Sequence, residues 1–238
     1  MLKHPAISLL FPAYNEEANI ALSVEQAERV LQGLTGAFEI VVVDDGSRDG
    51  TARVLDELAA SRPYLKVVRH ATNLGYGAAL WSGIQAARYD WVFFTDADLQ
   101  FDLGEISALL GYIPEFKAVI GYRSPRRDPL VRRMNGWGWN MLVRLLFGLK
   151  VRDVDCAFKL FDRKMLAGLP LVTRGAAMSA EMLIRLQHMG IAWKEVPVRH
   201  LPRQRGRSTG ANPAVITRAF RELFRLYIEQ PWDDAAMR

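Results

Sequence analysis

The sequence predicts an α/β fold in which helices flank a mainly parallel sheet. The first observation behind this prediction is size: 238 residues, half of them apolar, suit one large domain with a sizeable core. The second is the alternation of short apolar runs with segments of helical periodicity. The third is the run 38–43, which is rich in β-branched residues without polar alternation. Such a run is typical of a parallel strand that is covered on both faces.

Each element follows from the place where an apolar run or a periodic segment begins and ends. The first strand is an apolar run that ends at Pro12, and the first helix places Ile20, Val24 and Ala27 near helical spacing. Strands are expected over residues 6–11, 38–43, 65–69, 91–95, 118–121, 154–161 and 193–198. Helices are expected over residues 18–34, 51–60, 77–87, 104–113, 129–148, 179–189 and 213–229, with a loop at 202–210.

Composition and charge narrow the class of protein. The single cysteine, Cys156, has no partner for an internal disulfide, which suits a reducing compartment, and it is expected to be a small buried hydrophobe. We expect no signal peptide, and no apolar run approaches the ~18 residues of a spanning helix. Residues 1–120 hold 9 basic against 16 acidic residues, whereas residues 121–238 hold 22 against 10. Such halves can bracket a metal and a polyphosphate, and a basic half also suits nucleic acid or an anionic membrane.

The strongest candidates for chemistry are Asp96 and Asp98, which follow the expected strand 91–95. Ligands of open α/β sheets sit beyond the carboxyl ends of the strands, and adjacent carboxylates repel each other unless a cation lies between them. Hard oxygens suit Mg²⁺ or Mn²⁺, which then bridges phosphates, and Gln100 adds an oxygen two residues later. The alternative is an ordinary strand-to-loop turn, where Asp is common.

Acidic residues also follow the first two expected strands. Carboxylates at these positions can accept hydrogen bonds from a base or a ribose, and an aromatic ring can stack on a base. The residues concerned are Tyr14 and Glu16 after the first strand, and Asp44 and Asp45 after the second. The alternative for both segments is a helix start, in which a short polar side chain caps the first turn. The capping candidates are Asn15, Asp49 and Thr51.

Arginines form the last candidate group, because guanidinium groups bind phosphate in a forked geometry. They are Arg123 after a strand, Arg132 and Arg133 in an expected helix, and Arg203, Arg205 and Arg207 in the loop before the final helix. Most surface arginines are simply solvated, and nucleic-acid binding also predicts an arginine-rich loop. Nucleic-acid binding does not, however, predict three acidic strand ends.

In combination these segments resemble the family-2 inverting glycosyltransferases with the A-type fold, in the branch of dolichol-phosphate mannose synthases and polyprenyl-phosphate glycosyltransferases. The likeness covers roughly residues 6–210. In the first half it rests on Pro12-Ala-Tyr-Asn-Glu16, on 41–51, on Asn73-Leu-Gly-Tyr-Gly77, on Thr95-Asp-Ala-Asp-Leu-Gln100 and on Gly121-Tyr-Arg123. In the second half it rests on 153–161, Ser179-Ala-Glu-Met-Leu183, Val196-Pro-Val198 and 203–208.

The resemblance implies a role for each matching residue. A nucleotide-sugar donor would contact Pro12, Tyr14, Glu16, Val43 and Asp45 in a nucleoside pocket, together with Asp96, Ala97, Asp98, Arg123 and Arg205. The metal, Mg²⁺ or Mn²⁺, would be held by Asp96, Asp98 and Gln100. The acceptor phosphate would meet Arg132, Arg203 and Arg205, and the catalytic residues would be Asp96, Asp98 and Arg123.

The resemblance also implies an organisation and two departures from the family pattern. Residues 1–238 would form a single Rossmann-like domain, with the nucleotide-sugar and metal half at about 1–122 and the acceptor half at about 123–230. Many relatives have Ser-Gly-Phe where this chain has Cys156-Ala-Phe158, and many have a Lys where Thr209 stands. The second departure bears on the binding of the acceptor phosphate.

The implied function is metal-dependent transfer of a hexose from GDP-mannose or a UDP-sugar to a polyprenyl or dolichyl phosphate. The segment 129–149 combines arginines with tryptophans, so it fits either the interface of an anionic membrane or a core helix. We therefore expect a cytoplasmic protein, peripheral at the cytoplasmic face of the membrane, with no nucleic-acid partner. Two alternatives stay open: transfer to a hydroxyl of a soluble or polysaccharide acceptor, and a non-catalytic basic module that binds membrane or nucleic acid.

Overall fold

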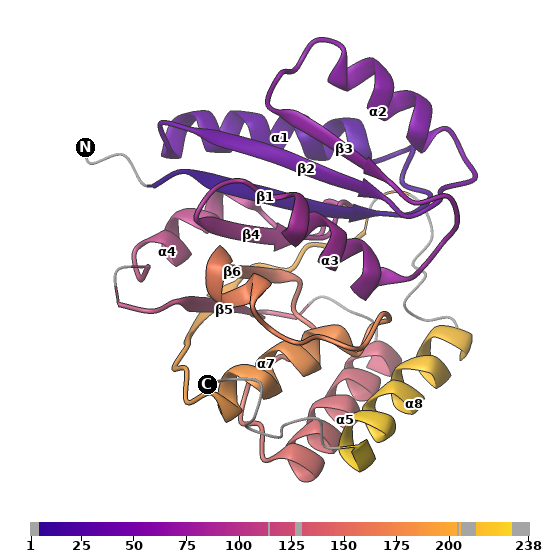
Figure 1. Cartoon of the computed structure of the whole chain (residues 1–238), viewed down its shortest axis with the longest axis vertical. Helices are drawn as coiled ribbons and strands as arrows, with labels where there is room; N and C mark the ends of the chain where they lie inside the picture. Colours follow the sequence, from indigo (N-terminus) through magenta and orange to yellow (C-terminus); the bar gives the residue numbers. More distant parts are fainter. Residues whose placement is uncertain (1–4, 114, 127–129, 204, 206–212, 230–238) are drawn as a thin grey trace.

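The computed structural model describes residues 5–113, 115–126, 130–203, 205 and 213–229 (Figure 1). Its centre is a seven-stranded sheet with the order β3-β2-β1-β4-β6-β5-β7. The strands are β1 (Ile7–Ala13), β2 (Phe38–Asp44), β3 (Leu65–Arg69), β4 (Trp91–Thr95), β5 (Ala118–Arg123), β6 (Phe158–Asp162) and β7 (Lys194–Val198). The helices are α1 (Ile20–Leu34), α2 (Thr51–Ala59), α3 (Tyr76–Ala86), η1 (Leu103–Glu105), α4 (Ile106–Leu110), α5 (Leu130–Phe147), α6 (Arg163–Ala167), α7 (Met178–His188) and α8 (Pro213–Glu229).

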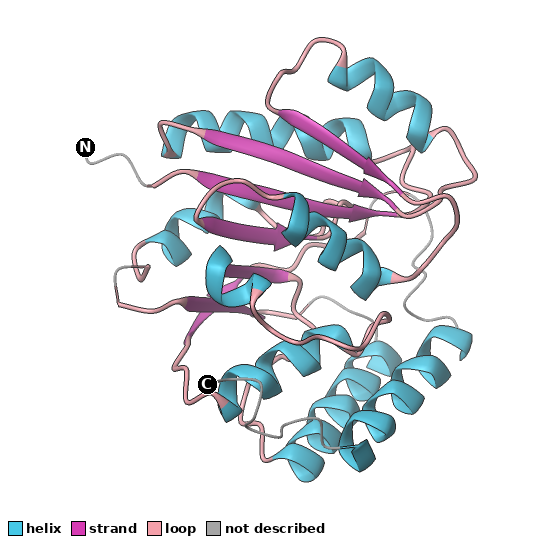
Figure 2. Ribbon diagram, in the orientation of Figure 1, coloured by secondary structure: helices cyan, strands magenta, loops and turns pink. Residues whose placement is uncertain are grey.

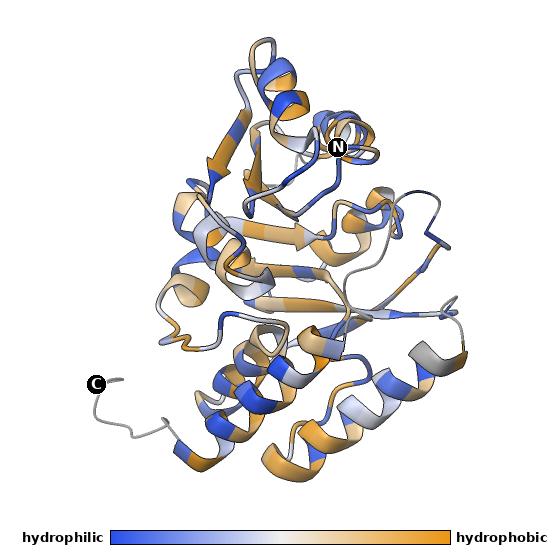
Figure 3. Cartoon of the chain, turned by 90° about the vertical axis from the view of Figure 1, so that its right-hand side faces the viewer, coloured by the Kyte–Doolittle hydropathy of each residue, from blue (hydrophilic) through white to orange (hydrophobic). Residues whose placement is uncertain are grey.

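The sheet separates two hydrophobic cores, because consecutive side chains of a strand point to opposite faces. On β1, Leu9 and Phe11 join the core beneath α1, α2 and α4, whereas Leu10 joins the core beneath α3, α5, α6, α7 and α8. Helices therefore cover both faces of the sheet (Figure 2), and the central strands are hydrophobic over most of their length (Figure 3). The expected α/β fold with a mainly parallel sheet is confirmed.

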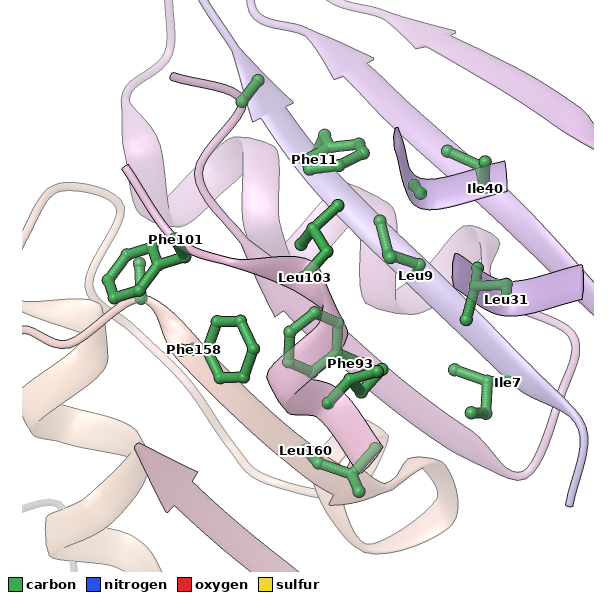
Figure 4. Packing of buried hydrophobic residues seen from close by; sticks show 14 of the residues in the cluster. Ile7, Leu9, Phe11, Leu31, Ile40, Phe93, Phe101, Leu103, Phe158 and Leu160 are labelled. Carbon is green, nitrogen blue, oxygen red and sulfur yellow. The ribbon is translucent and has the colours of Figure 1, made fainter. Parts of the chain in front are cut away.

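Aromatic rings bind the middle of the sheet to the loop that follows β4. The ring of Phe158 lies 4.7 Å from that of Phe93 and 5.4 Å from that of Phe101, measured between centroids. Figure 4 shows these three rings together with Leu103 and Leu160. This packing anchors β6 against β4, so the segments that leave these two strands start from fixed positions.

One expected boundary was wrong, because β1 does not end at Pro12. The strand continues to Ala13 and pairs with β2 in the register Pro12↔Val43. On its other edge β1 pairs with β4 only as far as Leu10. Beyond Leu10 that edge has no neighbouring strand in this sheet, so a residue without a backbone N–H is tolerated there.

The start of β6 was also placed wrongly, since residues 154–157 lie outside the strand, which begins at Phe158. The cause is Lys159, whose ammonium group donates to the carbonyl oxygens of Val154 and Cys156 and folds the preceding segment back. The short helix α6 directly after β6 was not expected. The other expected strands and helices are present, with slightly different ends.

Strand directions bring distant segments to one edge of the sheet. β2 and β4 are both parallel to β1, so these three strands run in the same direction. β4 and β5 are both antiparallel to β6, so β5 runs in that direction too. The carboxyl ends of β1, β2, β4 and β5 consequently lie at one edge, which we call the carboxyl edge. Because β7 is parallel to β5, the segment after Val198 also leaves from this edge. The reversed strand β6 begins there, so the turn before it reaches the same place.

Candidate active site

Arg203 connects two of the acidic strand ends at the carboxyl edge. Its guanidinium group donates to both carboxylate oxygens of Glu16, at 2.7 and 3.0 Å, and to Asp98 at 3.1 Å. All three side chains are largely buried. The structure therefore brings together residues that are more than 80 positions apart in sequence, and it places a positive charge between two carboxylates.

Asp96 has the most perturbed carboxyl group of this edge. Burial, reinforced by the negative charge of Asp98, raises its pKa to about 7, although Arg123 acts in the opposite direction. The hydroxyl of Tyr76, at the start of α3, is hydrogen-bonded with Asp96, and burial together with this carboxylate raises the pKa of Tyr76 well above its ordinary value. The segment around Tyr76 is part of the family likeness, yet the sequence assigned this residue no role.

Asp45 shapes the site indirectly. Its carboxylate accepts hydrogen bonds from the backbone N–H groups of Leu74 and Gly75, at 2.9 and 2.8 Å, and lies 2.6 Å from the ring of His70. Gly75 has a φ of +106°, which favours glycine. Asp45 thus holds the loop that leads into α3. Its hydrogen bonds go to other residues of the protein, so its effect on a ligand would be indirect.

The remaining residues predicted for the nucleoside pocket differ in exposure. Pro12 and Tyr14 are partly exposed, next to the end of β1. The side chain of Val43 is buried against α3 near Gly83, so only its backbone can face a ligand. Ala97 is buried, and its carbonyl oxygen accepts a 2.8 Å bond from the hydroxyl of Ser23. The grouping of these residues as a nucleoside pocket stays a prediction.

The helix-capping alternatives receive different outcomes. Asn15 does not cap α1, because its side-chain oxygen accepts from the backbone N–H of Arg48 and the helix begins only after Asn19. Asp49 does accept a bond from the backbone N–H of Thr51 at the start of α2. The hydroxyl of Thr51 in turn accepts from the backbone N–H of Glu16, so α2 supports the loop after β1.

Arg123 is held by a carboxylate that the sequence analysis did not assign. It makes a bidentate pair with Asp153 at 2.6 and 2.7 Å, and both side chains are 7 % exposed. Burial alone would raise the pKa of Asp153, but the hydrogen bonds and charge of Arg123 hold this pKa below its ordinary value. Arg126, which follows Arg123 by three residues, lies 3.9 Å from the same carboxylate.

The other predicted arginines are placed less completely. Arg205 is exposed, and its guanidinium group donates to the carbonyl oxygen of Ala18 at 3.3 Å. The backbone of Arg132 belongs to α5, but its side chain lies outside the described residues, as does all of Arg207. Gln100 is buried, and its side-chain amide donates to the carbonyl oxygen of Leu201, which ties the loop after β4 to the segment after β7.

Two other groups that chemistry often uses have structural roles. Cys156 is fully buried, as expected, and burial raises the pKa of its thiol to about 12, which excludes it as a nucleophile near neutral pH. Glu181 on α7 is buried as well. It accepts hydrogen bonds from the backbone N–H groups of Val172 and Thr173 and pairs with Arg185 at 2.7 Å. Glu181 is therefore occupied in holding a loop.

The acidic residues of the edge suit a divalent cation that is bound together with a diphosphate. Within the described ranges, no three His, Cys, Asp or Glu side chains gather as a metal site on their own. Mg²⁺ and similar ions usually take one or two carboxylates and complete their shell with waters and substrate phosphates. The pKa of Asp96 is raised because its carboxylate is buried close to another carboxylate, and a cation nearby would relieve this repulsion. Glu16 and Asp98 already share one positive charge, that of Arg203.

The comparison with protein families decides the assignment. The model of glycosyl transferase family 2 matches residues 8–169. The chain belongs to this family. The match contains β1 to β6 and all the acidic strand ends described above, whereas β7, the Arg203 segment and α8 lie beyond it.

Two curated glycosyl-transferring proteins are similar over most of this chain. An undecaprenyl-phosphate 4-deoxy-4-formamido-L-arabinose transferase of Pectobacterium atrosepticum is 32% identical over 166 residues, which cover 68% of this chain and 50% of the relative. The glycosyltransferase AglD of Haloferax volcanii is 33% identical over 204 residues, which cover 81% of this chain and 32% of the relative. The chain thus spans half or less of the length of these relatives.

Solved structures share the fold. Glucosyl-3-phosphoglycerate synthase from Mycobacterium tuberculosis, crystallised with Mn²⁺, uridine diphosphate and glucosyl-3-phosphoglycerate, has a TM-score of 0.71 at 23% identity, covering 93% of this chain and 79% of that one. Mannosyl-3-phosphoglycerate synthase from Rubrobacter xylanophilus has a TM-score of 0.74 at 20% identity, covering 95% and 75%. At this level of identity the likeness concerns the fold.

Proposed function

We propose that this chain is a metal-dependent inverting glycosyltransferase that moves a hexose from a nucleotide-sugar, GDP-mannose or a UDP-sugar, to a polyprenyl or dolichyl phosphate. The observation that carries the proposal is the meeting of Glu16, Asp96 and Asp98 with Arg123 and Arg203 at one edge of the sheet. Carboxylates suit a divalent cation on the donor diphosphate, and arginines suit phosphate. The names of the curated relatives, which include an undecaprenyl-phosphate transferase, support the choice of acceptor.

Each group of residues has a task in this reaction. Asp96 and Asp98 would hold Mg²⁺ or Mn²⁺, which neutralises the diphosphate and makes it a better leaving group. Pro12, Tyr14, Glu16, Val43, Asp45 and Ala97 would surround the nucleoside and the start of the diphosphate. Arg123, oriented by Asp153, and the arginines Arg132, Arg203 and Arg205 would hold the donor and acceptor phosphates close together despite their like charge.

A phosphate acceptor places fewer chemical demands on the site than a hydroxyl group does. A phosphate monoester is anionic near neutral pH and attacks without a strong general base, whereas a sugar hydroxyl needs one. Glu181 is buried and fully engaged with backbone groups and Arg185, so it is unsuited to that role. Attack on the face of the anomeric carbon opposite the leaving group then inverts its configuration.

A lipid acceptor requires contact with a membrane, and α5 offers an apolar stripe for this purpose. Its exposed hydrophobic residues recur every three or four positions, so they share one face of the helix. They are Leu130, Met134, Trp137, Met141 and Leu145. The helices α5 and α8 pack side by side through ring contacts of Trp139 with Phe220 and of Phe147 with Tyr227 (Figure 1). Phe224 and Ile228 on α8 are exposed as well.

Arginines border this apolar surface, as expected for a helix that lies in the interface of an anionic membrane. Arg133 and Arg144 on α5, and Arg221 and Arg225 on α8, are exposed. Each basic residue near an anionic surface contributes about 1 kcal/mol, over a distance of roughly 8 Å at physiological salt. None of the helices in the described part of the chain is long and apolar enough to cross a bilayer. The apolar stripe of α5 and the arginines beside it support our proposal of reversible, peripheral attachment at the cytoplasmic membrane face.

Donor binding and product analysis test the proposal. A thermal-shift panel of GDP- and UDP-sugars with Mn²⁺ should show stabilisation by one donor, and EDTA should remove it. Incubation of that labelled donor with undecaprenyl phosphate should then move label into the organic phase. Label that stays in water-soluble products would favour a soluble acceptor. Donor stabilisation that persists in EDTA would contradict the proposed metal.

A further inference from the structure

The turn before β6, residues 153–157, also lies at the carboxyl edge, and it contains a carboxylate without a role in the proposed function, that of Asp155. In the antiparallel pair of β4 and β6, Thr95 lies opposite Phe158. The chain after Thr95 and the chain before Phe158 therefore leave the sheet side by side. The metal motif Asp96-Ala-Asp98 follows Thr95, and Asp155 lies three residues before Phe158, so the two segments are neighbours.

Asp155 differs from every other acidic residue at this edge. Its side chain is exposed, and no hydrogen bond or ion pair to its carboxylate is found in the described part of the chain. The charged groups that act electrostatically on its carboxylate are Asp153 from its own turn, Arg123 and Arg126 from the segment at the end of β5, and Lys159 from β6. Tyr76 from α3, the partner of Asp96, also lies within electrostatic range. Asp155 is thus an available acceptor inside the site.

The backbone that carries Asp155 is fixed from both sides. The fully buried Lys159 donates to the carbonyl oxygens of Val154 and Cys156, which flank it. Asp153 is locked to Arg123, and its carbonyl oxygen accepts the N–H of Cys156 at 3.3 Å. An acceptor on such a rigid turn needs little ordering when a ligand arrives, which is a property of specificity-determining positions.

The chemistry of the proposed ligands leaves one partner for this carboxylate. The diphosphate and the acceptor phosphate are anions, so the carboxylate of Asp155 would repel them. Arg123 and Arg203 each pair with another carboxylate, Asp153 and Glu16 respectively, so Asp155 is not needed as their partner. The transferred sugar is the uncharged part of the donor and presents hydroxyl groups that donate hydrogen bonds. A carboxylate with two free oxygens accepts from two neighbouring hydroxyls.

We propose that Asp155 recognises the transferred sugar by accepting hydrogen bonds from its hydroxyl groups, and so determines which nucleotide-sugar is used. This inference rests on the proposed function, because it requires a nucleotide-sugar at the carboxyl edge. It adds a specificity-determining residue in the acceptor half, at the turn where this chain has Asp155-Cys-Ala-Phe158.

Binding measurements that separate the sugar from the nucleotide test the inference. With Mn²⁺ present, titration calorimetry on the full chain would give Kd for UDP, GDP, UDP-glucose, UDP-galactose, UDP-N-acetylglucosamine and GDP-mannose. Asp155→Ala should weaken the preferred nucleotide-sugar about 10-fold or more, as for loss of hydrogen bonds to a charged group, and leave the matching nucleoside diphosphate unchanged. Asp155→Asn keeps one oxygen acceptor and should show a smaller loss.

Asp56→Asn on α2 is the matched control, since Asp56 is an exposed carboxylate that pairs with Arg69. It should change neither affinity. Equal effects of Asp155→Ala on nucleotide and nucleotide-sugar, or no effect on either, would overturn the inference and leave the proposed function standing. Unchanged donor affinity with lost turnover on a hydroxyl acceptor would make Asp155 a general base instead, which also overturns it. Failure of the wild type to bind any of the nucleotides would reject the proposed function itself.

Discussion

The two halves of the sheet supply the carboxyl edge in opposite ways. In the half built from β1, β2 and β4, side chains such as Glu16 and Asp96 follow parallel strands, and the local strand direction alone brings them to the edge. In the half built from β5, β6 and β7, the strand β6 runs backwards, so Asp153 and Asp155 precede their strand. Polar residues after strands therefore reveal only part of this site. Polar residues that precede a reversed strand can be assigned to the site only when the sheet topology is known.

The halves also differ in how they treat their charges and apolar surfaces. The first half is acidic, and its carboxylates gather near one guanidinium group, that of Arg203. The second half is basic and leaves a stripe of large apolar side chains exposed on α5. The first arrangement is suited to a small polyanionic ligand with a cation. The second is suited to an extended anionic surface with an apolar interior.

The largest effect is expected at the acidic edge, from Asp98→Asn. This change removes the negative charge but keeps the shape, so turnover should fall at least about 10²-fold and donor binding should weaken, while the fold persists. Steady-state kinetics and calorimetry would measure both effects, with Asp56→Asn as the control. An active Asp98→Asn protein, or full activity in EDTA, would remove the metal from the first half.

A buried and an exposed arginine should respond differently to substitution: the buried Arg123 in both stability and turnover, the exposed Arg205 in turnover alone. Arg123→Ala removes the bidentate partner of the buried Asp153 and leaves it only the longer contact with Arg126, at 3.9 Å. Stability should therefore fall by about 3 kcal/mol, the lower end for a broken buried pair, in addition to a turnover loss of roughly 10²-fold. The exposed Arg205 should behave differently: Arg205→Ala should reduce turnover alone, and Arg205→Lys should restore part of it. Denaturant unfolding and kinetics would distinguish the pair.

If either alanine variant shows wild-type kinetics, that arginine does not belong to the site. A stability loss for Arg205→Ala equal to that for Arg123→Ala would contradict the difference in burial between the two residues.

Substitution of two tryptophans on α5 should distinguish a residue that attaches the protein to membranes from one that packs in the core. Trp137 is 66% exposed, whereas Trp139 is 8% exposed and its ring meets that of Phe220 at 5.4 Å. Trp137→Ala should weaken co-sedimentation with anionic vesicles at unchanged stability. Trp139→Ala should destabilise the fold by about 3 kcal/mol. Wild-type protein that stays in the supernatant with anionic vesicles at low salt would reject membrane attachment and favour a soluble acceptor.

The smallest effect is a pH-dependent gain of stability from Asp155→Asn. Although Asp155 lies at the surface, the dense surroundings of the carboxyl edge desolvate its carboxylate. This desolvation, helped by the charge of Asp153, raises the pKa of Asp155 to about 6, from an ordinary value of 3.8. Because the folded state holds this proton more tightly than the unfolded state, wild-type stability contributed by Asp155 is lost as the pH rises from about 4 to 6. The variant should therefore melt roughly 2 °C above the wild type at pH 7.5 and at the same temperature near pH 4, since exposure screens the effect. Melting curves that differ equally at both pH values would contradict this.

The sequence predicted the fold and the acidic strand ends because both follow from local pattern. Continuous apolar runs mark covered strands, and Asp96 and Asp98 stand directly after one of them. The extension of β1 through Pro12 could not be predicted, because it depends on β4 ending its pairing at Leu10. The different fates of Trp137 and Trp139 depend on where α8 packs, which is again a contact between distant segments.

The partners of the site residues were missed for the same reason. Asp153 was quoted only as part of a family motif, and its pairing with Arg123 joins residues 30 positions apart. Arg203 was expected to meet phosphate, and nothing local indicated that it would lie between Glu16 and Asp98. A buried Lys within an apolar run was the one local signal available for the turn before β6. Lys159 is that residue.

The reversed direction of β6 has a consequence for how the protein can change over generations. β6 is paired on both edges and its rings are packed against β4, so its register is determined independently of the residues in the turn before it. Substitutions at the exposed tip of that turn can therefore alter what the carboxyl edge recognises while the sheet keeps its geometry. A new preference should therefore cost little stability when it arises at the exposed Asp155, because the buried Asp153 and its pair with Arg123 stay in place.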